Sequence, residues 1–177
     1  MNTSFNFYRI KMAYKDTDEL GTIVNVKTED LAMATCYADV ENIAYKLAEG
    51  KNKFGDVDYE IIRTKISEIV YNDTFATDTE TICGLIAYYF EEGQETEVGL
   101  YQVNLVYYDM DEKTGKTKKQ NSTIFVPAHS SSEAINNTHT YLKRVGEARE
   151  YTIRNVKYDK AQSVMVTPTT HQFNIQP

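Results

Sequence analysis

The sequence predicts an α+β protein made of two tandem ββαβ units, which together form a pseudo-twofold sheet-and-helix domain. Three observations predict this class: an internal repeat, a strand-like alternation of apolar and polar residues, and two helical segments. The chain has 177 residues, of which 41% are hydrophobic and 25% charged. That size and composition are typical of a globular protein with its own core, and they argue against long disorder.

The repeat is clearest where residues 8–19 are compared with residues 101–112. Both segments begin with a tyrosine, have a second tyrosine at the seventh position and end in Asp-x-Asp-Glu. Further along, a strand-like segment that opens with Tyr59 returns as one that opens with Tyr151. The number of residues between matching positions of the two segments stays nearly constant, which indicates that a unit of about 70 residues occurs twice in the chain.

The elements of the first unit follow from periodicity. Apolar and polar residues alternate over 8–15, which predicts a strand with one buried face. A turn is expected over 16–21 and a return strand from 23 onward. Apolar residues three and four apart predict a helix over 35–49, and the last strand is expected over 59–70.

The second unit repeats these elements in the same order. We expect a strand over 101–107, a turn over 110–116 and a return strand over 123–127. The helix is expected to begin at 130–133, where serine is followed three residues later by glutamate in a capping-box pattern. The closing strand is expected over 151–166.

Four consecutive regions are therefore predicted. The first ββαβ unit covers 1–75, and an acidic linker with an extra strand over 81–90 covers 76–98. The second unit covers 99–166. Residues 167–177, which contain two prolines and no helical pattern, form an extended C-terminal arm.

The charge is distributed unevenly along the chain. The formal net charge is −7, and residues 76–98 alone carry six acidic and no basic side chains. Residues 99–177 carry ten basic and seven acidic side chains. One interpretation is two solvated faces, and the other is head-to-tail association between the acidic segment of one copy and the basic half of the next. The acidic total argues against a sequence-specific or general nucleic-acid binder.

Three groups of residues are the candidate protein interface. Four lysines crowd the second hairpin tip, where they either protect a solvated edge or contact an acidic neighbour. Two apolar residues two positions apart in the C-terminal arm suit strand addition to a neighbour. The full set is Glu91, Glu92, Glu95, Glu97, Lys113, Lys116, Lys118, Lys119, Phe173 and Ile175.

Residues with the spacing of a catalytic or metal site are scarce. Cys36 and Cys83 are far apart with no nearby histidine pair, so we expect buried reduced thiols rather than zinc. His139 is expected on the inner face of the second helix. We therefore predict no catalytic residues, no metal and no cofactor, and a protein that is not an enzyme. No apolar run is long enough to span a bilayer, so no membrane contact is expected.

The repeated order of a tyrosine strand, an Asp-x-Asp-Glu turn, a capped helix and a second tyrosine strand resembles an uncharacterised family of duplicated domains. This family occurs in Bacteroidetes and in the crAss-like phages that infect them, and the resemblance covers 8–71 and 100–166. It transfers no site residues, because the family has no assigned catalytic residues.

The resemblance implies a structural virion protein of a tailed bacteriophage, which assembles as a ring at the portal–tail neck. Its partners would be copies of itself in a cyclic homo-oligomer and neighbouring portal or tail proteins. It would be made in the host cytoplasm and end in the virion. The alternative is a cytoplasmic protein-binding or regulatory module, encoded by a mobile element and without catalysis.

Overall fold

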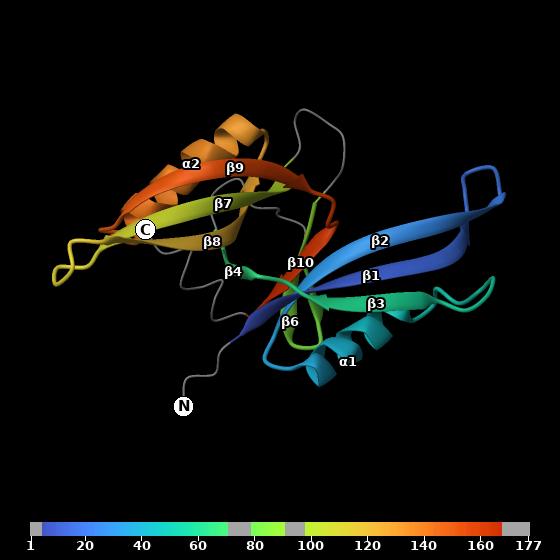
Figure 1. Ribbon diagram of the computed structural model, residues 1–177. Helices are drawn as coiled ribbons and strands as arrows, with labels where there is room; N and C mark the ends of the chain where they lie inside the picture. Colours follow the sequence, from blue (N-terminus) through green and yellow to red (C-terminus); the bar gives the residue numbers. More distant parts are fainter. Residues whose placement is uncertain (1–4, 71–78, 91–97, 168–177) are drawn as a thin grey trace. The chain divides into compact units, whose positions relative to one another are not determined.

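The computed structural model describes residues 5–70, 79–90 and 98–167 and shows a mixed α+β chain, mostly sheet with two helices (Figure 1). The predicted α+β class is therefore confirmed. The chain divides into two compact units. Among the described residues, unit 1 comprises 5–64, 79–89 and 161–167. Unit 2 comprises 65–70, 90 and 98–160.

Unit 1 contains a six-stranded sheet in the order β3-β1-β2-β10-β6-β5. Neighbouring strands are antiparallel except β10 and β2, which are parallel. The strands are β1 (Asn6–Thr17), β2 (Ile23–Ala34), β3 (Asp58–Arg63), β5 (Thr79–Ile82), β6 (Leu85–Tyr89) and β10 (Ser163–Val166). The edges of the sheet are thus β3 and β5.

The β1–β2 hairpin is long and regular, and the alternation that predicts β1 is visible in the burial of Tyr8, Ile10 and Met12. It pairs twelve residues of each strand in register. Asp18 closes the turn, since one of its carboxylate oxygens accepts hydrogen bonds from the backbone N–H groups of Leu20 and Thr22 at 2.9 and 2.8 Å. Gly21 has a φ of +79°, which glycine adopts without strain.

Helix α1 (Tyr37–Ala48) covers one face of this sheet (Figure 1). Its apolar stripe buries Val40, Ile43 and Ala44, which confirms the predicted helix with slightly shorter bounds. The core that it forms with the sheet also includes Tyr8, Ile10, Met12, Ala32, Ala34, Ile82, Ala87 and Met165.

Unit 2 contains a four-stranded sheet in the order β4-β8-β7-β9, with helix α2 over one face (Figure 1). Ser130 caps α2, because its side-chain oxygen accepts a hydrogen bond from the backbone N–H of Glu133 at 3.1 Å, as the capping-box pattern predicts. The elements are β4 (Ile66–Ile69), β7 (Gly99–Met110), β8 (Thr117–Ala128), α2 (Ser131–Arg144) and β9 (Glu150–Asp159).

Three predicted strands differ from those observed. The strand expected over 59–70 is two strands, β3 in unit 1 and β4 in unit 2. The strand expected over 151–166 is likewise divided into β9 in unit 2 and β10 in unit 1. The strand expected over 81–90 is the β5–β6 hairpin. Among the described residues, unit 1 therefore combines three separate stretches of the chain, and unit 2 combines 65–70 with later residues. Alternation along a strand does not reveal which sheet the strand joins.

The expectation of buried cysteines is wrong. Both Cys36 and Cys83 are exposed free thiols. Cys36 precedes α1 as its N-cap residue, and Cys83 lies in the tight β5–β6 turn with a φ of +49°. A cap and a turn place their side chains outside the core, whatever the apolar character of the residue.

Candidate functional site

The lysine tip, which we define as Lys113, Lys116, Lys118 and Lys119, lies at the outer end of the β7–β8 hairpin. All four lysines are exposed. The loop between the strands is held by Asp111, whose carboxylate accepts a hydrogen bond from the backbone N–H of Lys113 at 2.9 Å. Two backbone hydrogen bonds of 2.8 Å, from Asp111 to Lys116 and from Gly115 to Asp111, complete the turn. The tip therefore presents its charges on a defined loop.

The lysine tip is positive overall, because residues 110–120 carry four lysines against Asp111 and Glu112. Lys118 lies directly opposite Asp109 in the strand register, and the Lys119 ammonium lies 6.0 Å from the centre of the Tyr108 ring. Exposed ammonium groups of this kind pair with carboxylates and aromatic faces, and each such contact contributes about 1 kcal/mol or less. The geometry is compatible with the predicted acidic neighbour.

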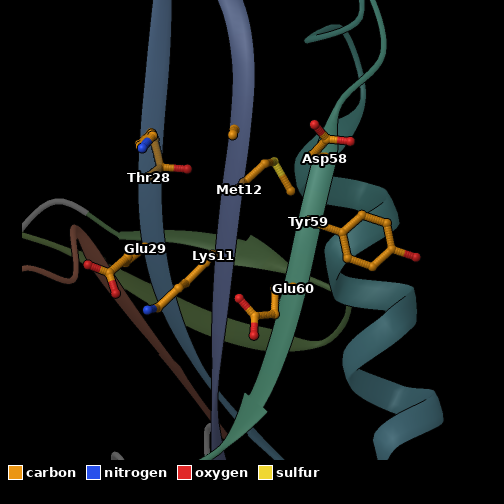
Figure 2. A pocket seen from close by; sticks show the side chains of 9 residues that line it. Lys11, Met12, Thr28, Glu29, Asp58, Tyr59 and Glu60 are labelled. Atoms are coloured by element: carbon orange, nitrogen blue, oxygen red, sulfur yellow. The ribbon is translucent and has the colours of Figure 1, made fainter.

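A second surface, the tyrosine patch, lies on the outer side of α1 and on β3. We define it as Tyr37, Glu41, Tyr45 and Tyr59. The first three are four residues apart and so share one face of the helix. Tyr59 extends from β3 toward α1, and its ring centre lies 6.3 Å from that of Tyr45 (Figure 2).

The tyrosine patch is unusually open for its aromatic content. Tyr37, Tyr45 and Tyr59 are 51%, 66% and 39% exposed. Partial burial raises the pKa of Tyr59, and the nearby Tyr45 and Glu41 raise it further. Exposed tyrosines that lie together are typical of protein interfaces, where the ring packs and the hydroxyl stays hydrated.

Unit 2 has no such patch at the matching positions. Counted from the N-cap residue, α2 carries Ser131, Ile135 and His139 where α1 carries tyrosine, glutamate and tyrosine. His139 is exposed, not on the inner helix face as expected, and its Nδ1 lies 2.6 Å from the Tyr151 hydroxyl. At these helix positions, the two units share the contact between the ninth helix residue and a tyrosine on the following strand.

A shallow pocket of about 420 Å³ lies over strands β3, β1 and β2 of unit 1 (Figure 2). Ala13 of β1 is among its lining residues and lies between Lys27 of β2 and Asp58 of β3 in the strand register. Lys11 lies opposite both Glu29 and Glu60 in the strand register, and Arg9 forms an ion pair of 3.7 Å with Glu29. The lining residues are Lys11, Met12, Ala13, Lys27, Thr28, Glu29, Asp58, Tyr59 and Glu60. The lining thus carries two basic and three acidic side chains.

A cation lies over a hairpin tyrosine in each unit. In unit 1 the Lys51 ammonium is 5.1 Å from the centre of the Tyr14 ring. In unit 2 the Arg149 guanidinium is 4.1 Å from the centre of the Tyr107 ring. Arg149 also donates two hydrogen bonds, of 2.8 and 3.0 Å, to the carboxylate of Glu147, which lowers the pKa of that carboxyl. These contacts attach the segment after each helix to the adjacent hairpin.

Asp30 is the most unusual titratable group of unit 1, because its carboxylate is buried. It accepts hydrogen bonds from the Ser163 hydroxyl and from the Gln162 side-chain amide, the latter at 3.2 Å. Burial raises the pKa of Asp30, and these two hydrogen bonds oppose that shift. The group joins β10 to β2, and a structural role accounts for its contacts.

Several predicted site residues have no described position. Glu91, Glu92, Glu95, Glu97, Phe173 and Ile175 lie outside the described residues. Of the predicted interface, only the four lysines can be placed. The tyrosine patch was missed, although the spacing of Tyr37, Glu41 and Tyr45 within a predicted helix was visible in the sequence.

Two general features bear on the class of protein. Within residues 5–70, 79–90 and 98–167, no three His, Cys, Asp or Glu side chains converge as metal ligands would. Over the same part of the chain, neither helix has the length and hydropathy that crossing a membrane requires.

The comparison with protein families gives one result. The sequence model of a domain of unknown function, DUF4494, matches residues 6–167, and so includes all the strands and helices described above. No curated protein matches the chain.

Proposed function

The chain belongs to the DUF4494 family, and we propose that it is a structural protein of a tailed-phage virion. In this proposal, copies of the chain form a ring at the portal–tail neck. The observation that carries it is the pair of unlike exposed surfaces, the lysine tip on unit 2 and the tyrosine patch on unit 1. A closed ring needs two different surfaces on each copy, because each subunit contacts one neighbour with its front and the other with its back.

The proposal includes a tandem duplication of the ββαβ unit. Its support is the order β1-β2-α1-β3 in unit 1 and β7-β8-α2-β9 in unit 2. Asp18 and Asp111 close equivalent hairpin turns, and Lys51 and Arg149 lie over equivalent tyrosines. Duplication supplies two related halves whose surfaces can diverge, and the tyrosine patch is one product of that divergence.

The two surfaces would contribute differently to assembly. Opposite charges mainly set the register and the rate of association, and they select the partner. Buried aromatic rings supply most of the affinity, since tyrosine is among the residues that dominate binding energy. A ring of this kind would also contact neighbouring portal or tail proteins. The chain would be made in the host cytoplasm before it enters the virion.

The second candidate is a cytoplasmic protein-binding or regulatory module encoded by a mobile element. The feature that favours it is the restriction of the tyrosine patch to unit 1. One patch of this kind is sufficient for a monomeric or dimeric module that binds a single, different protein.

The test is quantitative peptide mass spectrometry on gradient-purified virions of the phage whose genome encodes the chain. We expect peptides of the chain at the copy number of the portal protein or at a simple multiple of it. Abundant host cytoplasmic proteins serve as the control for carry-over. If the portal protein is well detected and the chain is absent, the virion proposal is wrong and the cytoplasmic module takes its place.

A further inference from the structure

We propose that the lysine tip of one copy binds the tyrosine patch of the next copy. This inference rests on the proposed self-assembly and names the contact that produces it. The occupant of the tyrosine patch is thus a second copy of this chain, presented through Lys113, Lys116, Lys118 and Lys119.

The first argument is the chemistry of the two surfaces. A tyrosine face attracts an ammonium group through the electrons of its ring. The chain already uses contacts of this kind in both units, among them Lys51 over Tyr14 and Lys119 over Tyr108. Three exposed rings on one surface offer the same contact to lysines that arrive from outside.

The second argument is charge complementarity. Residues 37–49, which contain α1, carry three acidic side chains and one lysine, whereas residues 110–120 carry four lysines and two acidic side chains. Glu41 lies between Tyr37 and Tyr45 on the helix face, so a carboxylate stands at the centre of the aromatic surface. An ammonium group bound there would contact rings and a carboxylate together.

The third argument is shape. The lysine tip is a narrow hairpin end whose loop is already closed by the hydrogen bonds of Asp111, so little ordering is needed on binding. The tyrosine patch lies on a helix and on the edge strand β3, both regular elements that hold their side chains in place. Because unit 2 lacks a matching patch, the contact is heterologous and continues from copy to copy.

The experiment measures self-association of the full chain by sedimentation velocity over a wide range of protein and salt concentrations. Tyr45→Ala removes the most exposed ring of the patch, and Lys113→Glu with Lys116→Glu reverses the tip. Each change is expected to weaken association at least about tenfold. Lys157→Glu with Lys160→Glu, the same charge change at other exposed lysines of unit 2, is the matched control and should leave association unchanged.

A charge exchange makes the test specific for the pair of surfaces. Glu41→Lys alone should weaken association, and adding Lys116→Glu in the same chain should restore most of it, because opposite charges again face each other across every contact. Circular dichroism verifies that each variant is folded.

The outcomes separate the inference from the proposal on which it rests. If the wild-type chain associates and the tyrosine and lysine variants associate equally well, the inference is wrong and self-assembly stands on another surface. The inference is also wrong if only one of the two surfaces matters, or if the charge exchange restores nothing. If the wild-type chain is monomeric at every concentration, both the contact and the proposed self-assembly are wrong.

Discussion

Replacing Asp30 with alanine should destabilise unit 1 more than any surface substitution. Asp30 in β2 and Ser163 in β10 are each 1% exposed, and they pair directly in the parallel register of the two strands. The carboxylate accepts hydrogen bonds from Ser163 and Gln162. β10 pairs with β2 on one side and with β6 on the other, so this polar contact is one of several attachments that hold β10 in the sheet.

The expected loss follows from the groups that alanine leaves unpaired. A buried polar group without its partner costs about 1–3 kcal/mol, and Ser163 would lose the acceptor of its hydroxyl. The side-chain amide of Gln162, which is partly buried, would also lose its hydrogen bond to Asp30, and this bond is worth roughly 1 kcal/mol. Asp30→Ala should therefore reduce the free energy of unfolding by about 2–4 kcal/mol. Asp30→Asn keeps an acceptor for the Ser163 hydroxyl and should remain within about 1 kcal/mol of wild type.

The pH dependence has a definite sign. Burial raises the pKa of Asp30 in the folded chain, so the folded state holds this proton at pH values where the unfolded state has lost it. The contribution of Asp30 to stability is therefore greatest below about pH 4, the unfolded pKa, and falls as pH rises through the folded pKa. Asp30→Asn cannot titrate. The stability difference between variant and wild type should thus move in favour of the variant as pH rises.

Urea denaturation followed by far-UV circular dichroism, at several pH values between 4 and 8, measures both effects. Hydrogen exchange of the β10 amides shows whether the loss is local to that strand. Asp56→Ala, at an exposed carboxylate of the same unit, is the matched control and should change stability by less than about 0.5 kcal/mol. An Asp30→Ala loss no larger than that of the control would refute the reasoning. An unaltered pH dependence in Asp30→Asn would show that Asp30 is not the titrating group.

Three further predictions concern local packing and helix capping, and urea denaturation tests all three. A Cβ at Gly99 would lie 2.8 Å from Cε2 of Tyr158, so Gly99→Ala displaces this partly exposed ring and should cost about 1 kcal/mol. That loss should largely disappear in a Tyr158→Ala background, and an equal loss in both backgrounds would contradict the steric account. Ser130→Ala removes the side-chain cap of α2 and should cost about 1 kcal/mol. Cys36 has nearly the same N-cap backbone angles without a side-chain cap bond, so Cys36→Ser should gain roughly 0.5–1 kcal/mol. A neutral or destabilising Cys36→Ser would show that cap chemistry does not limit α1.

Local features of the fold could be predicted because they depend on nearby residues. The apolar positions of the alternation over 8–15 are buried in β1 at Tyr8, Ile10 and Met12. The apolar spacing within 35–49 corresponds to the buried stripe of α1. The capping pattern at Ser130 marks the true start of α2. The exposure of the lysine tip could also be predicted from the sequence, since a hairpin turn places its polar residues in solvent wherever the two strands lie.

Other features required the tertiary structure. The parallel pairing of β10 with β2 joins residues more than a hundred positions apart, and it buries Asp30, which reads as an ordinary surface carboxylate in the sequence. The tyrosine patch likewise depends on Tyr59 of β3 lying beside Tyr45 of α1. The periodicity of apolar residues in the sequence indicates only on which face of its own helix or strand a residue lies. The neighbours of that face, and hence its burial and chemistry, are decided when distant strands and helices pack together.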